Sequence, residues 1–162
     1  MIDEQLKILK FMSEMTTRTD TNEFSQKMGL TSAQLVHQMQ ELVKLGYLKK
    51  VGEGFSITEK GRKVLKLMKT LPENHKFHFY IAVGHPTNLY AGNAKEFLDQ
   101  VLKVDAASLE FHIYRGDFES WFRNALGDAS FADEISKLKK KNLHEEELRK
   151  ALARAVEAEF SL

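Results

Sequence analysis

The chain has 162 residues, of which 43% are apolar and 29% are charged, and it contains no cysteine. This is the composition of a globular protein that folds as one domain or two small ones, and the lack of cysteine excludes disulfide bonds and thiolate metal sites. The formal net charge is only +1, so the chain as a whole has little general attraction for a polyanion.

No apolar run reaches the roughly 18–20 residues that a membrane span requires. The N-terminal stretch carries Asp3 and Glu4 rather than the basic start of a secretory signal. The absence of cysteine also suits a reducing compartment. We therefore expect a cytoplasmic protein without a membrane partner.

Basic residues are concentrated in one part of the chain. Residues 1–75 contain 12 Lys and Arg against 9 Asp and Glu, whereas residues 76–162 contain 12 against 14. Residues 44–69 alone contain eight basic residues and two glutamates. Such a patch can bind phosphates on an otherwise neutral protein, although a solvated helix face would have the same composition.

The first half of the chain begins with two predicted helices. Residues 3–15 have the apolar spacing of an amphipathic helix. Residues 16–21, TTRTDT, suit either a short edge strand or a turn. A short helix over residues 22–28 then ends at Gly29, because a left-handed C-cap favours glycine.

A third helix over residues 31–45 has the clearest signals. Thr31 and Gln34 have the spacing of a capping box, in which each side chain bonds the other residue's backbone N–H. Gly46 stands where the helix should end. The apolar positions of one buried stripe are Leu35, Val36, Met39, Leu42 and Val43.

A hairpin and a further helix follow. Residues 47–51 and 55–57 read as two short strands, joined by a turn over residues 52–54 that contains two glycines. Thr58 is placed to cap a helix over residues 59–69. The predicted order is therefore helix, helix, turn, helix, hairpin, helix.

The segment LVKLGYLKKVGEGFSITEKGRKVL, residues 42–65, resembles a segment of the winged helix-turn-helix transcriptional regulators of bacteria and archaea. The resemblance covers most of residues 5–70. It implies a DNA-binding domain over residues 1–71, in which helix 31–45 enters the major groove and the hairpin is the wing. The matching residues are Leu42, Gly46, Tyr47, Leu48, Ile57, Thr58, Lys60 and Gly61.

The resemblance also implies which residues contact double-stranded DNA. They are Thr31, Ser32, Gln34, His37 and Gln38 of the helix, and Lys49, Lys50, Gly54 and Lys60 of the wing and the turn after it. Because the helix has no Arg or Lys before Lys44, we expect the phosphate contacts to come from the wing and from the basic helix that follows. Two copies of the chain would read two half-sites, so we expect a homodimer.

The second half of the chain changes character. Leu71-Pro72-Glu73-Asn74 breaks the basic helix and marks a domain boundary, with a second domain over residues 76–162. Residues 77–84 read as a strand and residues 85–88 as a loop. Residues 106–114 suit a helix capped by Asp105, although LEFHIY would also suit a strand. A helix over residues 93–104 would bury Phe97, Leu98, Val101 and Leu102.

Three more helices complete the prediction. Asp117 is placed to cap a helix over residues 118–126 that ends at Gly127, and Asp128 opens another that runs to about residue 141. Residues 143–160 form the last. The first helix and the last, with Leu148, Leu152, Val156 and Phe160, are the candidate pairing surfaces of the homodimer. The expected fold class is mainly α with a small β wing, plus a small, mostly helical α+β domain.

A second resemblance lies within this half. The stretch SLEFHIYRGDFESWFRNALGD, residues 108–128, resembles a small domain of unassigned function found in archaeal and bacterial proteins. The F-H and G-D-F-x-x-W elements are the specific part of the pattern, and the likeness covers roughly residues 77–155. It implies a family but no activity.

The candidate ligand pocket of the second domain consists of Tyr80, His85, His112 and Arg115, for a regulator that responds to a small-molecule effector. A His112–Asp117 pair could also do acid–base work, but a capping aspartate and a core histidine explain it equally. No nucleophile motif, phosphate loop or HExxH is present, so we expect no enzyme, metal or cofactor. The alternative to DNA binding is a protein-interaction adaptor that docks through the winged helix.

Overall fold

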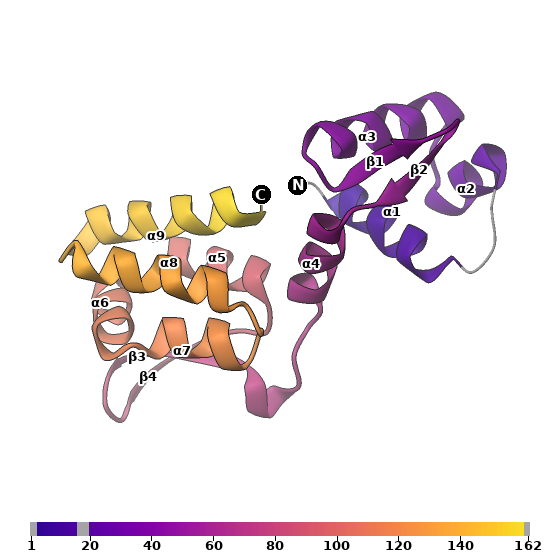
Figure 1. Cartoon of the computed structure of the whole chain (residues 1–162). Coiled ribbons are helices and arrows are strands. Elements are labelled where there is room, and N and C mark those ends of the chain that lie inside the picture. The colour runs from indigo at the N-terminus through magenta and orange to yellow at the C-terminus, as the bar shows by residue number, and fades with distance from the viewer. Residues whose placement is uncertain (1–2, 16–19, 161–162) are drawn as a thin grey trace. The chain divides into compact units, whose positions relative to one another are not determined.

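The structure is a computed structural model that describes residues 3–15 and 20–160 (Figure 1). The chain forms two compact units, Met1–Lys66 and Leu67–Leu162, here called unit 1 and unit 2. Both are built mainly of helices, and each contains one two-stranded antiparallel sheet within the described ranges. The expected class, mainly α with a small β component, is confirmed at this level. The expected strand or turn at 16–21 falls largely on residues 16–19, outside the described residues.

Unit 1 follows the predicted order of elements. They are α1 (Asp3–Glu14), α2 (Thr21–Met28), α3 (Ser32–Lys44), β1 (Leu48–Val51), β2 (Gly54–Ile57) and α4 (Glu59–Met68), whose last turn crosses into unit 2. Ile8 and Leu9 of α1 and Leu35 and Leu42 of α3 are fully buried, and α1 packs against α3. This burial holds α3 in place and leaves its opposite face exposed.

Caps define the helix ends of unit 1, and those predicted at Gly29, Thr31 and Gly46 are present. Asp20 caps α2, which ends at Gly29 with φ 70°. Thr31 and Gln34 make both bonds of the capping box at the start of α3. Gly46 follows α3 with φ 82°, a conformation that costs glycine little.

The junction between α3 and α4, here called the joint, explains several residues of the motif that resembles winged-helix regulators. The Thr58 hydroxyl donates to the Gly46 carbonyl at 2.6 Å and accepts from the Gly61 N–H at 3.1 Å. The Lys60 ammonium donates to the Leu45 carbonyl at 2.8 Å and lies 4.8 Å from the Tyr47 ring centroid. These contacts tie the end of α3 to the start of α4.

After the end of α4, unit 2 continues with a short 3-10 helix, η1 (Glu73–His75), and a hairpin of β3 (Phe77–Ala82) and β4 (His85–Ala91). The loop expected at residues 85–88 is wrong, because these residues open β4. The chain reverses earlier, at Val83 and Gly84, where Gly84 has φ 77°. Pro86 is tolerated because the pairing is irregular, with register shifts between His78 and Ala82.

Five helices follow the hairpin in unit 2. They are α5 (Ala94–Lys103), α6 (Ala106–Arg115), α7 (Asp117–Asn124), α8 (Ala129–Lys140) and α9 (Glu145–Phe160). Residues 106–115 are helical, so the strand alternative is excluded. The expected burial of Leu102 is wrong, since this side chain is 55% exposed while Val101 faces the core.

The expected role of Asp117 as a helix cap is also wrong. Gly116, in the left-handed conformation, takes the N-cap position of α7, and Asp117 is the first helical residue. Its carboxylate instead accepts a hydrogen bond from His112. By contrast, Asp105 and Asp128 do cap α6 and α8 through bonds to Ala107 and Phe131.

The core of unit 2 is rich in aromatic rings. Phe97 lies edge-on to Phe118 and Phe122, and its ring centroid is 5.0 Å from theirs in both cases. Aromatic pairs prefer this edge-to-face arrangement. The last helix, α9, packs on α5, α6 and α8. Its predicted pairing residues Leu148, Leu152, Val156 and Phe160 are all fully buried in this core, so they are not available to a second copy.

Candidate functional sites

The exposed face of α3 differs from the predicted one. Ala33, Gln34, His37 and Gln40 are exposed on one side of the helix, at spacings of three and four residues. Sequence reasoning missed Gln40, although its position three residues after His37 was a usable signal.

Two of the predicted DNA-contacting residues lie on the flanks of α3 instead. The Ser32 hydroxyl donates to the Asn22 side chain of α2 at 3.0 Å, and the Gln38 side chain accepts from Gln5 of α1 at 3.1 Å. Both are therefore engaged in holding the helices of unit 1 together.

The capping box uses hydrogen-bonding groups of two further predicted contact residues, Thr31 and Gln34. Gln34 Oε1 accepts from the Thr31 N–H at 2.9 Å, and Thr31 Oγ1 accepts from the Gln34 N–H at 3.1 Å. The side-chain NH₂ group of Gln34 is therefore left for another partner, whereas its oxygen already accepts a hydrogen bond. His37 and Gln40 are the residues of the exposed face that this geometry leaves least constrained.

The hairpin presents two lysines to solvent. Lys49 pairs with Ser56 and Lys50 with Phe55 across the hairpin, so their side chains point to opposite faces of the two-stranded sheet. Both are exposed, and neither forms an ion pair with any residue in the described ranges. Exposed lysines of this kind can contact phosphates.

The remaining predicted contacts have structural roles. Lys60 is engaged at the joint between α3 and α4, and Gly54 pairs with Val51 at the end of the hairpin. Lys44 is held by Glu41 at 2.7 Å, which also lowers the pKa of the Glu41 carboxyl below its usual value. The exposed face of α3 thus has almost no net charge, and the charge of this surface comes from the hairpin.

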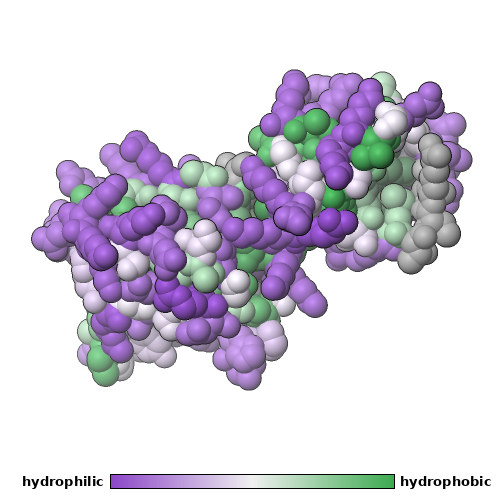
Figure 2. Space-filling view, in the orientation of Figure 1, coloured by the Kyte–Doolittle hydropathy of each residue, from purple (hydrophilic) through white to green (hydrophobic). Residues whose placement is uncertain are grey.

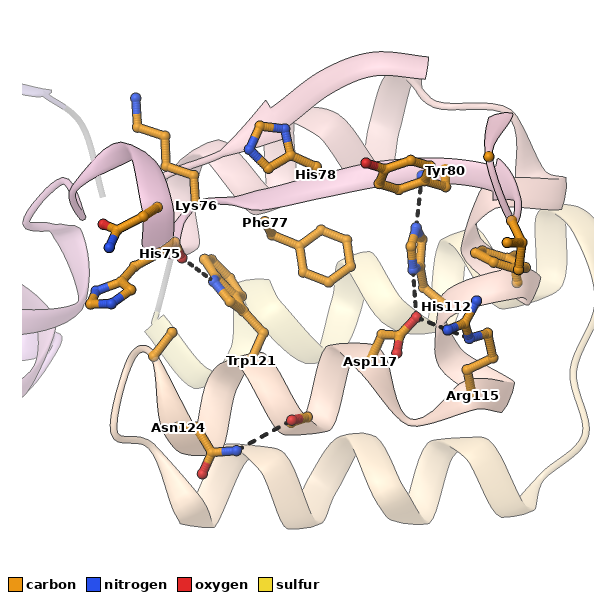
Figure 3. Close-up of a pocket in the computed structure, with 16 residues that line it drawn as sticks. His75, Lys76, Phe77, His78, Tyr80, His112, Arg115, Asp117, Trp121 and Asn124 are labelled. Carbon is orange, nitrogen blue, oxygen red and sulfur yellow. Dashed lines mark hydrogen bonds and ion pairs between the residues drawn. The ribbon is translucent and has the colours of Figure 1, made fainter. Parts of the chain in front are cut away.

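Unit 2 contains a cavity of about 680 Å³ between the β3 strand with η1 and helices α6 and α7 (Figure 3). Tyr80, His112 and Arg115 of the predicted pocket line it, whereas His85 lies exposed at the start of β4 and does not. Sequence reasoning missed several lining residues that come from separate elements: Asn74, His75, Lys76, Phe77, His78, Val83, Phe111, Asp117, Ser120, Trp121 and Asn124.

His112 is held at both ring nitrogens (Figure 3). Its Nε2 lies 2.8 Å from the Tyr80 backbone N–H, and its Nδ1 lies 2.9 Å from the Asp117 carboxylate. Because a backbone N–H can only donate, Nε2 accepts and the proton sits on Nδ1. Burial lowers the pKa of the imidazole, and the Asp117 carboxylate opposes that effect. Neither nitrogen is left for acid–base chemistry.

Arg115 and Asp117 form a loose, partly exposed ion pair at one end of the cavity. Arg115 Nε lies 3.6 Å from Asp117 Oδ2, and the two side chains are 50% and 33% exposed. The guanidinium lies over the Phe111 ring, 4.6 Å from its centroid. On the cavity wall between η1 and α7, the Trp121 indole donates to the His75 carbonyl at 2.9 Å.

The described residues contain no group of three or more His, Asp or Glu side chains arranged to hold a metal ion. Among the helices in the described ranges, none combines the length and apolarity needed to cross a bilayer. In Figure 2, the visible surface is largely hydrophilic, with a hydrophobic tip at the β3–β4 turn, where Val83 is 78% exposed.

Comparison with known families gives one match, which spans residues 14–157. The chain belongs to the DUF5752 family. This is a family of unknown function, and searches of curated proteins and of solved structures find no match. The DUF5752 region runs from the end of α1 into α9, so it includes the α3 face, the hairpin lysines and the cavity.

These geometries set what each surface of this DUF5752 protein can do chemically. The α3 face with the hairpin offers neutral hydrogen-bonding side chains beside two unpaired cations. The cavity offers an aromatic wall and the loose Arg115–Asp117 ion pair, while both ring nitrogens of its buried histidine already have hydrogen-bond partners. Both surfaces have groups that can bind a partner or ligand.

Proposed function

We propose that this protein binds double-stranded DNA through unit 1, with α3 as the recognition helix and the β1–β2 hairpin as the wing of a winged helix-turn-helix. The observation that carries the proposal is the pair of exposed lysines, Lys49 and Lys50, on a hairpin that packs beside α3. No neighbouring carboxylate in the described part of the chain pairs with these lysines, and each phosphate contact that a lysine makes releases counterions.

The exposed side chains of α3 supply the rest of the argument. A recognition helix reads base edges with polar side chains in the major groove, and Gln and His offer the donors and acceptors that this needs. Because that face has little charge, the affinity would come from the wing and any specificity from His37 and Gln40. A transcriptional regulator that acts as a homodimer remains the fuller form of this proposal.

A titration of fluorescent duplex DNA, followed by polarisation at 50 and 200 mM salt, tests the proposal. Replacing Lys49 and Lys50 with Ala should weaken binding to all duplexes. The slope of log affinity against log salt should fall by about 1 if one of the two lysines contacts a phosphate and by about 2 if both do, because about 0.9 counterions are released per contact. Replacing Lys140 and Lys141 with Ala is the matched control, since these are also adjacent exposed lysines and the change in charge is the same.

Equal losses in the two double variants would mean that only total charge matters, which contradicts a wing. The two single variants then locate the contact face, because Lys49 and Lys50 point to opposite sides of the hairpin. A complete absence of salt-sensitive duplex binding favours the second candidate, a protein-interaction adaptor. The observation that favours the adaptor is that Ser32, Gln34 and Gln38 bond within the protein.

A further inference from the structure

We propose that the cavity of unit 2 binds a free α-amino acid with a large apolar or aromatic side chain. This inference is independent of DNA binding, since it uses only residues of unit 2. A volume of about 680 Å³ lies within the range of small-molecule sites. The identity of the ligand follows from the two ends of the cavity.

The charged end of the cavity contains one cation and one anion, which do not form a close ion pair with each other. A tight arginine–carboxylate pair has N–O distances of about 2.7–2.9 Å, whereas Arg115 Nε and Asp117 Oδ2 are 3.6 Å apart. Within the described ranges, the guanidinium Nη atoms and Asp117 Oδ1 make no hydrogen bond. Both groups therefore keep hydrogen-bonding capacity for a ligand.

Each member of the pair is held in position by a neighbour. Asp117 is fixed by the Nδ1–H of His112, which is itself anchored to the Tyr80 backbone. Arg115 is fixed by its stacking on Phe111. Such pre-organisation reduces the entropy that a ligand would have to spend in ordering its site.

The charge balance of this end selects the class of ligand. A simple anion would meet the Asp117 carboxylate, and a simple cation would meet the Arg115 guanidinium. Lys76 adds no free charge, because its ammonium pairs with Glu73 at 2.6 Å. A group that carries a carboxylate and an ammonium on adjacent atoms satisfies both partners, and that group is the head of an α-amino acid.

The rest of the cavity selects the side chain of the ligand. Phe77 and Trp121 form the wall beyond the charge pair, as Figure 3 shows, and Val83 stands at the hairpin tip. These surfaces favour an apolar or aromatic body. Asn124 and Ser120, which are hydrogen-bonded to each other at 3.2 Å, line the wall on α7.

The fluorescence of Trp121 provides the test, because it is the only tryptophan in the chain and it lines the cavity. The full-length protein is titrated with each of the apolar and aromatic amino acids up to 10 mM, with tyrosine and tryptophan followed by calorimetry instead. We expect a saturable change for at least one of them. Its deaminated acid and its decarboxylated amine should each bind about 10- to 100-fold more weakly, as expected for the loss of a charged hydrogen bond.

Three variants make the assignment specific. Arg115→Met and Asp117→Asn should each weaken binding by about 10- to 100-fold; the asparagine keeps an acceptor for His112, so the fold is preserved. Arg123→Met is the matched control and should bind like wild type, because Arg123 pairs with Asp133 on the exposed side of α7 at 2.8 Å. Circular dichroism confirms that each variant is folded.

Three results would overturn the proposal. The first is that no amino acid changes the signal up to 10 mM. The second is that the deaminated acid binds as tightly as the amino acid, which would make the site an anion site. The third is that Arg115→Met or Asp117→Asn, when folded, binds with unchanged affinity.

Discussion

Gly61 lies where a side chain has no room. A Cβ atom at this position would stand 2.4 Å from the Tyr47 carbonyl oxygen and 2.8 Å from Ile57 Cγ2. The backbone oxygen cannot move away without breaking the joint, because the Thr58 N–H donates to it at 3.0 Å. The glycine of the matched motif is therefore required by close packing of α4 on the start of β1, whatever the surface of unit 1 binds.

Replacing Gly61 with Ala should lower the free energy of unfolding of the protein by about 1–3 kcal/mol, the usual cost of overpacking. Urea unfolding followed by far-ultraviolet circular dichroism measures it. Gly54→Ala is the control, since the nearest atom to its Cβ would be the Val51 carbonyl oxygen at 3.7 Å. Equal stability of Gly61→Ala and wild type would contradict the close approach.

His112 makes the stability of unit 2 depend on pH. Its folded-state pKa is lowered from 6.5, first by burial and also by Arg115, against the opposing effect of Asp117. Between the lowered pKa and 6.5 the unfolded chain binds more protons than the folded one, so stability rises with pH in that window. The contribution is complete above pH 6.5 and is lost as the pH falls through the window. Protonation would also place a donor against the Tyr80 N–H.

We expect His112→Gln to flatten this dependence, because glutamine does not titrate and can still offer a donor and an acceptor. Urea unfolding at pH 5 and pH 7, followed by Trp121 fluorescence, compares the two proteins. His85→Gln is the control, as His85 is exposed at the start of β4. A pH dependence that persists in His112→Gln but disappears in His85→Gln would refute the assignment.

At the scale of elements, helix ends hold unit 2 together. Arg149 of α9 donates through Nη1 to the Val101 and Val104 carbonyls at 2.7 and 2.6 Å. These carbonyls belong to the end of α5, where a cation is favoured by the helix dipole and the last carbonyls lack partners within the helix. Glu146, one turn earlier on α9, orients the guanidinium at 3.0 Å.

Replacing Arg149 with Gln should destabilise unit 2 by about 1.5–3 kcal/mol, the range for hydrogen bonds to a charged group. Thermal or urea unfolding monitored at Trp121 reports the change. Arg154→Gln, on an exposed position of the same helix, should have an effect within about 0.5 kcal/mol. If both variants lost the same stability, the cause would be helix propensity rather than the bonds to α5.

Elements also show the limits of sequence reasoning for the candidate DNA surface. The capping box, the stripe Leu35–Leu42 and the hairpin follow local rules, and the structure has them all. The partners of Ser32 and Gln38, however, come from α2 and α1. No local pattern predicts which neighbouring helix a polar side chain will meet, so the unengaged side chains of α3 could not be identified from its own sequence.

At the scale of the whole molecule, each unit has its own core and its own candidate site. The basic stretch 44–69 lies mostly in unit 1, where the proposed DNA contacts are, and the cavity lies in unit 2. The family match covers parts of both units. An effector site and a DNA-binding surface in one chain would suit a ligand-responsive regulator. That function would combine the proposed DNA binding of unit 1 with the proposed amino-acid binding of unit 2.

The sequence by itself determined most of the elements, because capping residues, left-handed glycines and apolar spacing act over a few neighbours. It misplaced β4, Asp117 and Leu102, where strand pairing or packing outweighs local preference. Only the tertiary structure decided that the apolar face of α9 is buried and that both ring nitrogens of His112 have partners. It also decided that Arg115 and Asp117 lie 3.6 Å apart in a cavity lined by Phe77 and Trp121. These depend on contacts between residues far apart in the chain, and such contacts are set by the packing of whole elements.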